Sequence, residues 1–373
     1  MCSLQDTSTE IKHCTPSNPS SQLYIIMPSS TSQTIIVTGA NGYLALHVIK
    51  QLLKTGYDVR GTIRSRKADD KLHATFPDYY GGRLTTTFVE DLANPELFRE
   101  AFDENTVGAI HVASPTHART EDAVRDMLNP AVKGAIGILE ASKIYASPSF
   151  HRVVHLSSTA AIMDSKKGPR PGYTYTNSDW NPVTFEEAAA IEDHVSLYVA
   201  SKALSEKAVW AWMTEHKPKF DLACVNPTMV FGPHLETISN MDEFTSTAKF
   251  LWRLVDAAEI PQLMWAGCVD VRDTAAMTVA AFEKHEAAGQ RLLLARHFDW
   301  QTAADIARDE LPGFRERFPV GRPGTGRSEA LKHIHQYDGS KAVKVLGVEY
   351  RPLSETVRDT LGQFLAVEGG KGH

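Results

Sequence analysis

A tyrosine and a lysine four positions apart are the first residues here whose types and spacing could do chemistry. Tyr198 and Lys202 lie in a segment that is expected to be helical, residues 197–216. The i, i+4 spacing places the phenol and the ammonium on one face of that helix. A free phenol has a pKa of about 10, and a nearby positive charge favours its ionised form, so the pair suits proton transfer.

The spacing by itself is a weak indication. With 11 tyrosines and 19 lysines in the chain, about half a match is expected by chance. A second pair does exist, Tyr337 and Lys341, but residues 338–340 read Asp-Gly-Ser, which is typical of a turn or helix cap. We therefore expect no catalytic role for the second pair. The first pair differs because it opens a strong helix and follows a strand that ends in Ser157 and Ser158.

A glycine-rich turn near the start of the chain indicates where a nucleotide would bind. An apolar strand, residues 34–38, runs into Gly39 and Gly42, and an apolar-periodic helix follows at once. Gly39 allows the sharp turn, Gly42 lets the backbone approach a pyrophosphate, and the small Ala45 lets the helix pack closely on the strand. The order strand, turn, helix presents a helix N-terminus to a phosphate. It predicts a dinucleotide-binding unit; the alternative is an ordinary turn.

The end of the second expected strand, residues 57–64, indicates which dinucleotide binds. In folds of this kind an acidic residue at that point would bind the 2′-hydroxyl of NAD. Here residues 64–67 read Arg-Ser-Arg-Lys, and no carboxylate follows until Asp69. Guanidinium and ammonium groups bind phosphate through charge-assisted hydrogen bonds, so the sequence favours NADP. The alternative is a solvated charged turn.

Further strands alternate with helices along the first two thirds of the chain. We expect strands at residues 84–92, 109–115, 152–159 and 220–227, and a long helix at 120–145 that is kinked or interrupted near Pro130. This alternation predicts an α/β fold, a Rossmann-type doubly wound parallel sheet with helices on both faces. Ligands bind such sheets outside the carboxyl ends of the strands. The residues expected there include the glycine turn, Arg64, Asp91, Ser114 and Ser158.

The ends of the chain and its insertion are expected to differ from this core. Residues 1–33 are rich in Ser, Thr, Pro and Gln, which predicts a disordered tail, and we hypothesise that Met27 is the natural start. Residues 34–233 are expected to form mainly the NADP-binding domain. Within it, the proline-interrupted residues 163–195 are expected to contribute to the substrate side.

The C-terminal third is expected to form a smaller substrate-binding region. We assign residues 234–368 mainly to it, with some segments returning to the Rossmann sheet, and residues 369–373 to a frayed end. The patterns within it predict helices at 244–257, 298–310 and 354–367, an Ala-rich helix reaching about 286, and a strand at 291–295.

Composition restricts the class of protein. A formal net charge of −6 argues against general binding to nucleic acid. The four cysteines, Cys2, Cys14, Cys224 and Cys268, are widely spaced and include no CxxC pair, so neither a zinc site nor a disulfide framework is expected. A reducing compartment, hence a cytoplasmic location, fits this usage best. No apolar run approaches the roughly 20 residues that a membrane span needs.

At this point the chain resembles a known superfamily. The TGxxGxxA turn at Thr38–Ala45 and the YxxxK motif at Tyr198–Lys202 are similar to those of the extended short-chain dehydrogenases/reductases. Five further pieces resemble the dihydroflavonol reductase-like branch, which includes fungal aldehyde, ketone and methylglyoxal reductases. They are VRGTIRS (59–65), HVASP (111–115), LSST (156–159), NPTMVFGP (226–233) and VDVRDTA (269–275). The similarity runs from about residue 34 to about 365. The departures are Ala45 at the last glycine position and His234 in a segment that tends to line the substrate pocket.

The resemblance implies a mechanism. Tyr198 would donate a proton to a carbonyl oxygen as hydride arrives from the nicotinamide. Lys202 would lower the pKa of Tyr198 and bind the nicotinamide ribose. Ser158 would hold the substrate oxygen by a hydrogen bond, with Ser157 and Thr159 as rivals. Alternation along the strand turns Ser157 to the other side, and a helix or turn cap is the alternative role for Ser158.

The resemblance also implies binding residues. For the cofactor they are Gly39, Asn41, Gly42, Tyr43, Leu44, Arg64, Lys67, Asp91, Leu92, Ala113, Ser114, Tyr198, Lys202, Pro227 and Val230, with Asp91 placed to face the adenine amino group. For the substrate they are Pro115, Thr159, Phe231 and His234. No metal is expected.

The function expected from the resemblance is NADPH-dependent reduction of an aldehyde or ketone to an alcohol. The partners expected are a small-molecule carbonyl substrate and NADPH/NADP+, without nucleic acid or membrane, and with the chain as a monomer or homodimer. One alternative is an NAD(P)-dependent 3β-hydroxysteroid or sugar-nucleotide dehydrogenase or epimerase. Another is a regulator that senses NADP without turnover, although such a protein has no use for Ser158, Tyr198 and Lys202.

Overall fold

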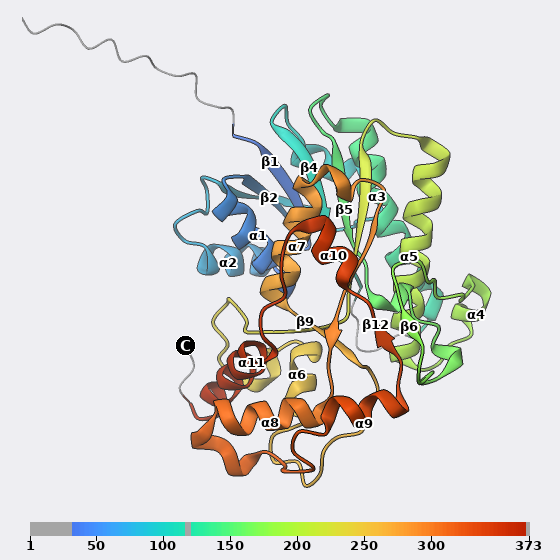
Figure 1. The fold of residues 1–373 in the computed structure, drawn as a ribbon. Coiled ribbons are helices and arrows are strands. Elements are labelled where there is room, and N and C mark those ends of the chain that lie inside the picture. The colour runs from blue at the N-terminus through green and yellow to red at the C-terminus, as the bar shows by residue number, and fades with distance from the viewer. Residues whose placement is uncertain (1–31, 116–120, 371–373) are drawn as a thin grey trace, which may run out of the picture. The chain divides into compact units, whose positions relative to one another are not determined.

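A seven-stranded parallel sheet forms the centre of the fold (Figure 1). The structure is a computed structural model and describes residues 32–115 and 121–370. The predicted Rossmann-type α/β architecture is confirmed, with every neighbouring pair of strands in the sheet parallel. Across the sheet the strands are β10 (Arg291–Leu294), β7 (Asp221–Pro227), β5 (Arg152–Leu156), β4 (Thr106–His111), β1 (Thr34–Thr38), β2 (Asp58–Ile63) and β3 (Leu84–Phe88).

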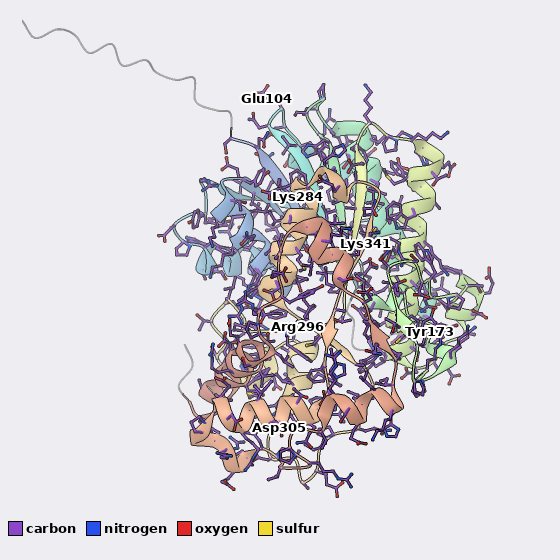
Figure 2. The ribbon with its side chains drawn as sticks, viewed as in Figure 1. Glu104, Tyr173, Lys284, Arg296, Asp305 and Lys341 are labelled. Atoms are coloured by element: carbon purple, nitrogen blue, oxygen red, sulfur yellow. The ribbon has the colours of Figure 1, made fainter. Side chains whose placement is uncertain are left out.

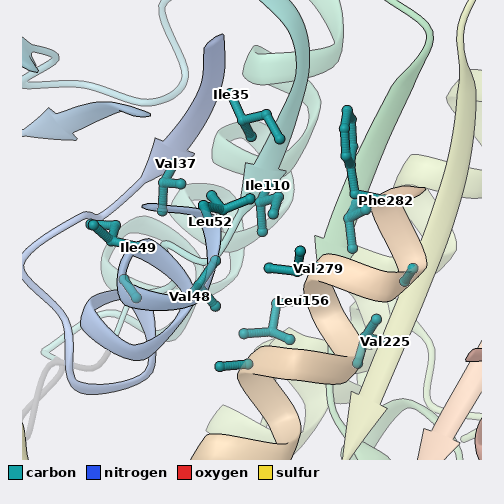
Figure 3. Close-up of a cluster of buried hydrophobic side chains, with 14 of the residues drawn as sticks. Ile35, Val37, Val48, Ile49, Leu52, Ile110, Leu156, Val225, Val279 and Phe282 are labelled. Carbon is teal, nitrogen blue, oxygen red and sulfur yellow. The ribbon is translucent and has the colours of Figure 1, made fainter. Parts of the chain in front are cut away.

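Helices cover both faces of this sheet because its strands are apolar on both sides. Ile35 and Val37 of β1 face one cluster, and Ile36 faces the other. Figure 3 shows the first cluster, in which side chains of the central strands meet those of two helices. The helices on this first face are α1 (Tyr43–Thr55), α2 (Arg66–Thr75), α7 (Val271–Glu283) and α10 (Ser340–Leu346). Those on the second face are α3 (Asn129–Tyr145) and α5 (His194–His216).

The C-terminal third contributes both to the main sheet and to a second core. Strand β10 pairs with β7, with Arg291 opposite Cys224, so this late segment returns to the Rossmann sheet. A three-stranded sheet lies beside a second apolar cluster that contains Phe231, Trp300 and Phe364. Its strands are β8 (Met229–Phe231), β9 (Gly267–Asp270) and β11 (Arg296–His297). The helices of this part are α6 (Ser246–Trp252), α8 (Trp300–Glu310), α9 (Gly326–His333) and α11 (Leu353–Glu368).

The insertion at residues 163–195 is tied to the C-terminal third. Strand β6 (Thr174–Tyr175) pairs in parallel with β12 (Gln336–Tyr337), and α4 (Phe185–Ala189) follows β6. The pairing brings the two segments expected to form the substrate side into direct contact.

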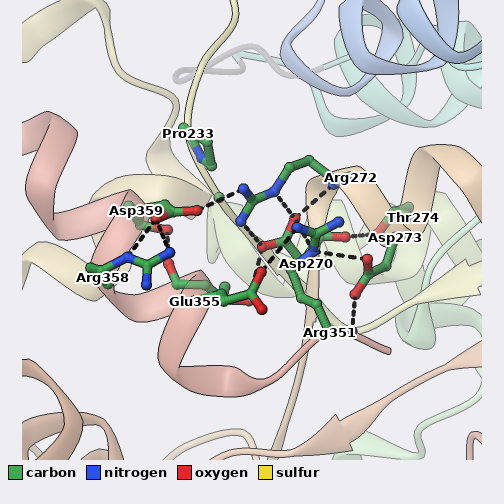
Figure 4. Close-up of polar contacts among 12 residues, drawn as sticks. Pro233, Asp270, Arg272, Asp273, Thr274, Arg351, Glu355, Arg358 and Asp359 are labelled. Atoms are coloured by element: carbon green, nitrogen blue, oxygen red, sulfur yellow. Dashed lines mark hydrogen bonds and ion pairs between the residues drawn. The ribbon is translucent and has the colours of Figure 1, made fainter. Parts of the chain in front are cut away.

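A buried carboxylate joins the main sheet's first face to the last helix. Asp270 ends β9, and its carboxylate accepts the backbone N–H of Arg272 at the start of α7 (2.8 Å). It also accepts the guanidinium of Arg272 (2.9 Å) and the hydroxyl of Thr356 in α11 (2.8 Å), as Figure 4 shows in part. Arg272 reaches on to Asp359 of α11 (2.6 Å). This cluster fixes α11 against the start of α7.

Several expected boundaries differ from the structure for local reasons. The helix expected at 120–145 begins with a π-helical turn, Val124–Leu128, and becomes α3 at Asn129, where Pro130 fits the first turn. The helix expected at 244–257 is only α6. Helix α5 begins three residues early because Asp193 caps it, its carboxylate accepting the N–H of Ser196 at 2.7 Å.

Some predictions fall on residues beyond the described ranges. Almost all of the expected tail, residues 1–33, lies there, as does the expected start at Met27, and the expected frayed end at 369–373 lies there in part. All three stay predictions. The division of the chain at residue 233 also stays a prediction. Among the described residues, none of the helices combines the length and apolarity that crossing a membrane would take.

Candidate active site

The glycine turn between β1 and α1 has the backbone that a phosphate site requires. Gly39 has a φ of +63°, and a Cβ at this position would lie 3.0 Å from both Cα and Cβ of Ala113. Only glycine fits both conditions. The hydroxyl of Thr38 accepts the backbone N–H groups of Val112 (3.1 Å) and Ala113 (3.2 Å), which ties the ends of β1 and β4 together. Local geometry and tertiary packing therefore fix this turn.

Helix α1 begins without a side-chain cap. Its N-cap residue is Gly42, which offers no side-chain hydrogen bond, and no acidic residue occupies the first turn. By contrast, Ser65 caps α2 and Asp299 caps α8. The first N–H groups of a helix need an acceptor, and the helix dipole favours an anion there. The start of α1 thus fits the pyrophosphate of a dinucleotide.

The basic residues after β2 divide into paired and unpaired groups. Arg66 pairs with Asp69 and Asp70, at 3.3 Å each. Arg64 and Lys67 are exposed and form no ion pair with any residue in the described ranges. No carboxylate in the described ranges neutralises these two charges, and their contact with a 2′-phosphate stays a prediction.

Asp69 is the first carboxylate after β2, and it is already engaged. It is 4% exposed and accepts hydrogen bonds from the hydroxyls of Tyr80 and Thr86, the latter at 2.8 Å. Because these contacts already occupy the carboxylate, Asp69 is poorly placed to accept a hydrogen bond from the 2′-hydroxyl of NAD. Its engagement agrees with the preference for NADP.

At the end of β3, Asp91 is exposed, and its carboxylate accepts the N–H of Ala93 (2.9 Å). Leu92 packs beside it against Gly137 of α3. Asp91 also lines a surface pocket, and its role toward adenine stays a prediction. The other residues of that pocket are Ala93, Asp122, Val124, Arg125, Asn129, Pro130 and Lys133.

Helix α5 brings Tyr198 and Lys202 to the end of β5. The ammonium of Lys202 donates to the backbone carbonyl of Leu156 (3.0 Å), the last residue of that strand. Ser157 and Ser158 follow directly, so the lysine is anchored beside the predicted catalytic serine. The second pair does not lie on one helix, because Tyr337 is in β12 and Lys341, which Figure 2 labels, is in α10. Their spacing therefore does not place them on one helix face, and the absence of a catalytic role for this pair stays a prediction.

Burial shifts the pKa values of both members of the pair. Burial raises the pKa of Tyr198 above its usual value, and the lowering of this pKa by Lys202 during turnover stays a prediction. Burial lowers the pKa of Lys202 to about 8, although Glu206 and Cys224 oppose this effect. A tyrosine held in its protonated form is the state that a proton donor needs.

The geometry of Ser158 is compatible with both roles considered for it, a turn cap and a hydrogen-bond donor to the substrate oxygen. Its Oγ accepts the N–H of Ala160 (3.1 Å) and so caps the short 3-10 turn Thr159–Ala161. The side chain is half-buried, and its proton remains free for another acceptor. Ser157 points elsewhere, as alternation predicted, and donates to Glu206 at 2.5 Å.

Two predicted substrate residues are packed into the protein. Phe231 is fully buried, and its ring lies against that of Phe298 at an interplanar angle of 58°, with 5.3 Å between ring centroids, within the C-terminal core. His234 is 5% exposed, and its ring lies against Tyr43 and Phe244. Tertiary packing turns both side chains inward, and their assignment to the substrate side stays a prediction.

The other predicted contacts keep positions compatible with their assignments. Thr159 Oγ1 donates to the carbonyl of Pro227 (3.4 Å), and Pro115 is half-buried beside residues outside the described ranges. The hydroxyl of Tyr43 is engaged with the carbonyl of Gly232 (2.8 Å), which leaves its backbone N–H for a ligand. Half-buried side chains are found at Asn41, Leu44, Ser114, Ala113 and Val230.

One buried residue next to the site, Glu206, was not predicted from the sequence. Glu206 is fully buried one turn after Lys202 and accepts hydrogen bonds from Ser157, Asn226 and Arg291. Its position in the sequence could have indicated it, because Glu206 lies four residues after Lys202 just as Lys202 lies four after Tyr198. Its partners come from distant strands, so the spacing could not have identified them.

This fold and this site define a class, the Rossmann-type oxidoreductases with a Ser-Tyr-Lys set. The chain belongs to the NAD dependent epimerase/dehydratase family, whose model matches residues 35–294, within the extended short-chain dehydrogenases/reductases.

Several relatives are similar along almost the whole chain. The "NADPH-dependent methylglyoxal reductase GRE2" of Saccharomyces cerevisiae is 35% identical over 90% of this chain and 99% of its own. "Ketoreductase azaE" of Aspergillus niger is 31% identical over 90% and 98%. The crystal structure of yeast methylglyoxal/isovaleraldehyde reductase Gre2 complexed with NADPH matches with a TM-score of 0.83, at 34% identity over 91% of this chain and 100% of that one.

Proposed function

We propose that this chain reduces an aldehyde or ketone to an alcohol with NADPH, and that Tyr198 is the proton donor. The observation that carries the proposal is Lys202, which lies on the Tyr198 face of α5 and is bonded to the strand end that leads into Ser158. The relatives support the reaction, since GRE2 is an NADPH-dependent methylglyoxal reductase and azaE a ketoreductase. The chain is thus an NADPH-dependent carbonyl reductase of the extended short-chain type.

The residues present fit the cofactor. The uncapped start of α1 would hold the pyrophosphate, and Arg64 and Lys67 would bind the 2′-phosphate. When bound, NADPH supplies the hydride that reduces the carbonyl carbon. Lys202 would bind the nicotinamide ribose.

The chain's own residues complete the reduction at the carbonyl oxygen. Ser158 would donate a hydrogen bond to that oxygen and orient it. Tyr198 would give its phenolic proton to the same oxygen, which becomes the alcohol. The charge of Lys202, one helical turn away, would stabilise the phenolate that remains. The hydride and the proton together account for the two hydrogens that the product gains.

We assign the substrate wall to the 163–195 insertion and the C-terminal third, supported by the pairing of β6 with β12. We also place the protein in the cytoplasm, in keeping with the unpaired and buried Cys224 and Cys268. Monomer or homodimer remains our expectation for its assembly.

The largest expected effect on activity is that of Tyr198→Phe. Loss of the proton donor should lower kcat by at least about 100-fold, while NADPH still binds. Spectrophotometric NADPH oxidation with a panel of aldehydes and ketones measures the rate, and fluorescence titration measures binding. Unchanged turnover would place the acid elsewhere.

The same panel separates the alternatives. Binding of NADPH without consumption would favour a cofactor sensor. Turnover of hydroxysteroids or nucleotide sugars with NAD would favour the dehydrogenase or epimerase alternative.

A further inference from the structure

Glu206 lies at the centre of a buried polar network that the proposed reaction does not yet use. One carboxylate oxygen accepts the hydroxyl of Ser157 and the side-chain amide of Asn226, at 2.5 Å each. The other accepts the guanidinium of Arg291 at 2.6 Å. A buried carboxylate is tolerated when its lone pairs are satisfied in this way, and the same contacts hold its partners in one geometry.

The network holds the predicted catalytic serine from two sides. Ser157 precedes Ser158 in the chain, and its hydroxyl is bound to Glu206. Asn226 donates through the same amide nitrogen to Glu206 and to the backbone carbonyl of Ser158 (3.1 Å). Both links come from Glu206, which stands on α5 together with Tyr198 and Lys202. The carboxylate therefore sets the distance between the catalytic helix and the catalytic serine.

Arg291 extends the network to the expected substrate wall. Its guanidinium donates to the backbone carbonyls of Asn177 (2.8 Å) and Asp179 (2.6 Å) in the insertion. It also donates to the carbonyl of Ala161 (3.2 Å), the last residue of the 3-10 turn that Ser158 caps. The ring of Trp180 lies 3.5 Å below the guanidinium. One ion pair thus joins β10, α5 and the 163–195 segment.

We propose that Glu206 is a positioning residue for the reduction, holding Ser158 against Tyr198 and supplying the negative charge that faces Lys202. The inference rests on the proposed reductase function. It adds to the Ser-Tyr-Lys set a fourth residue that acts through the other three without touching the substrate.

The groups around Lys202 indicate how this charge acts. From α5 it faces Glu206, from β7 Cys224, from β4 His111 and from β5 His155. Burial lowers the pKa of His111 to about 3 and that of His155 well below its usual value, and burial raises the pKa of the Cys224 thiol, so these three are neutral. Arg291 of β10 lies on the far side of Glu206. Of the two groups that raise the pKa of Lys202, Glu206 and Cys224, the Glu206 carboxylate has the larger effect.

Glu206→Gln tests the charge while keeping the shape. We expect kcat to fall about tenfold, and the alkaline limb of the pH profile of kcat/KM to move about one pH unit lower, because Lys202 then loses its proton more easily. The matched control is Glu215→Gln, an exposed glutamate on the same helix, which should match wild type in both measurements. A folded Glu206→Gln protein with the wild-type alkaline limb overturns the proposal.

Two further variants separate position from charge. Glu206→Asp keeps the charge but shortens the reach, so kcat should fall while the alkaline limb stays in place. Ser157→Ala removes the hydrogen bond between Glu206 and the residue before Ser158, so kcat should fall several-fold while the alkaline limb stays in place. This variant tests the positioning role if Glu206→Gln does not fold. NADPH binding confirms that each variant is folded, and wild-type kcat in Ser157→Ala overturns the positioning role. If wild type itself turns over no carbonyl compound, the proposed function fails and this inference with it.

Discussion

Two buried carboxylates, Glu206 and Asp270, solve the same electrostatic problem in different parts of the molecule. The Glu206 side chain is 0% exposed and that of Asp270 is 1% exposed. Glu206 is paired with Arg291, and Asp270 with Arg272 and, at 3.4 Å, with Arg351; both also accept neutral donors. The donors to Asp270 belong to the start of α7 and to α11. Those to Glu206 are Ser157, which precedes Ser158, Asn226, which also binds the carbonyl of Ser158, and Arg291 of β10. The burial and hydrogen bonding of a carboxylate therefore do not by themselves show its role. The role depends on which helices and strands the donors to that carboxylate belong to.

The strongest test of this difference is Asp270→Asn. Removing one partner of a buried, hydrogen-bonded ion pair costs about 3 kcal/mol of unfolding free energy. Denaturant unfolding measures that loss. We expect the folded variant to keep wild-type kcat at low temperature, because none of the Asp270 contacts reaches the reacting groups. A large fall in kcat for the folded variant would show that the two networks are not separate in function.

A matched control for Asp270→Asn is Asp242→Asn. The Asp242 side chain is fully exposed and lies 3.8 Å from Lys249. Exposed ion pairs contribute little, so its unfolding free energy should change by less than about 0.5 kcal/mol.

How far the sequence predicted these two regions depends on the range of the contacts. The turn at Gly39 and the pair on α5 are local patterns, set by backbone conformation and by 3.6-residue periodicity, and both were predicted. The ion pair between Glu206 and Arg291 spans 85 positions and exists only because β10 returns to the sheet beside β7. A strand was expected at 291–295, but no pattern in it shows which buried acid its arginine meets.

The direction in which the side chains of a predicted segment point also depends on long-range contacts. Phe231 and His234 were assigned to the substrate side from the segment in which they occur. In the structure the backbone N–H and carbonyl of His234 are both bound by the Gln363 side chain of α11, at 2.8 and 3.0 Å. That long-range contact fixes the direction of the segment. Motif position predicts where a segment lies, and packing decides which way its side chains point.

Two arginines on the surface, Arg64 and Arg66, differ in whether a carboxylate is bound to them. Arg66 is bound by Asp69 and Asp70, whereas Arg64 has no ion-pair partner within the described ranges. Arg64→Ala should therefore lower the preference for NADPH over NADH, as the ratio of kcat/KM, by at least about tenfold, since a hydrogen bond to a charged group is lost. Arg66→Ala should change the ratio much less. Equal effects would mean that the ion pairs of Arg66 break when the cofactor binds.

The smallest effect should appear in the pH dependence of stability. Burial raises the pKa of Asp270, but the hydrogen bond and charge of Arg272 outweigh it, and the net pKa lies below the usual value. An acid whose pKa is lowered by folding adds stability above its unfolded pKa of about 3.9, and this stability is lost as the pH falls through the folded pKa. The difference in unfolding free energy between wild type and Asp270→Asn should therefore be constant above about pH 5 and shrink below about pH 4. Urea unfolding across that range measures it, and a difference that stays constant into acid would mean that the carboxylate charge does not stabilise the contact between α7 and α11.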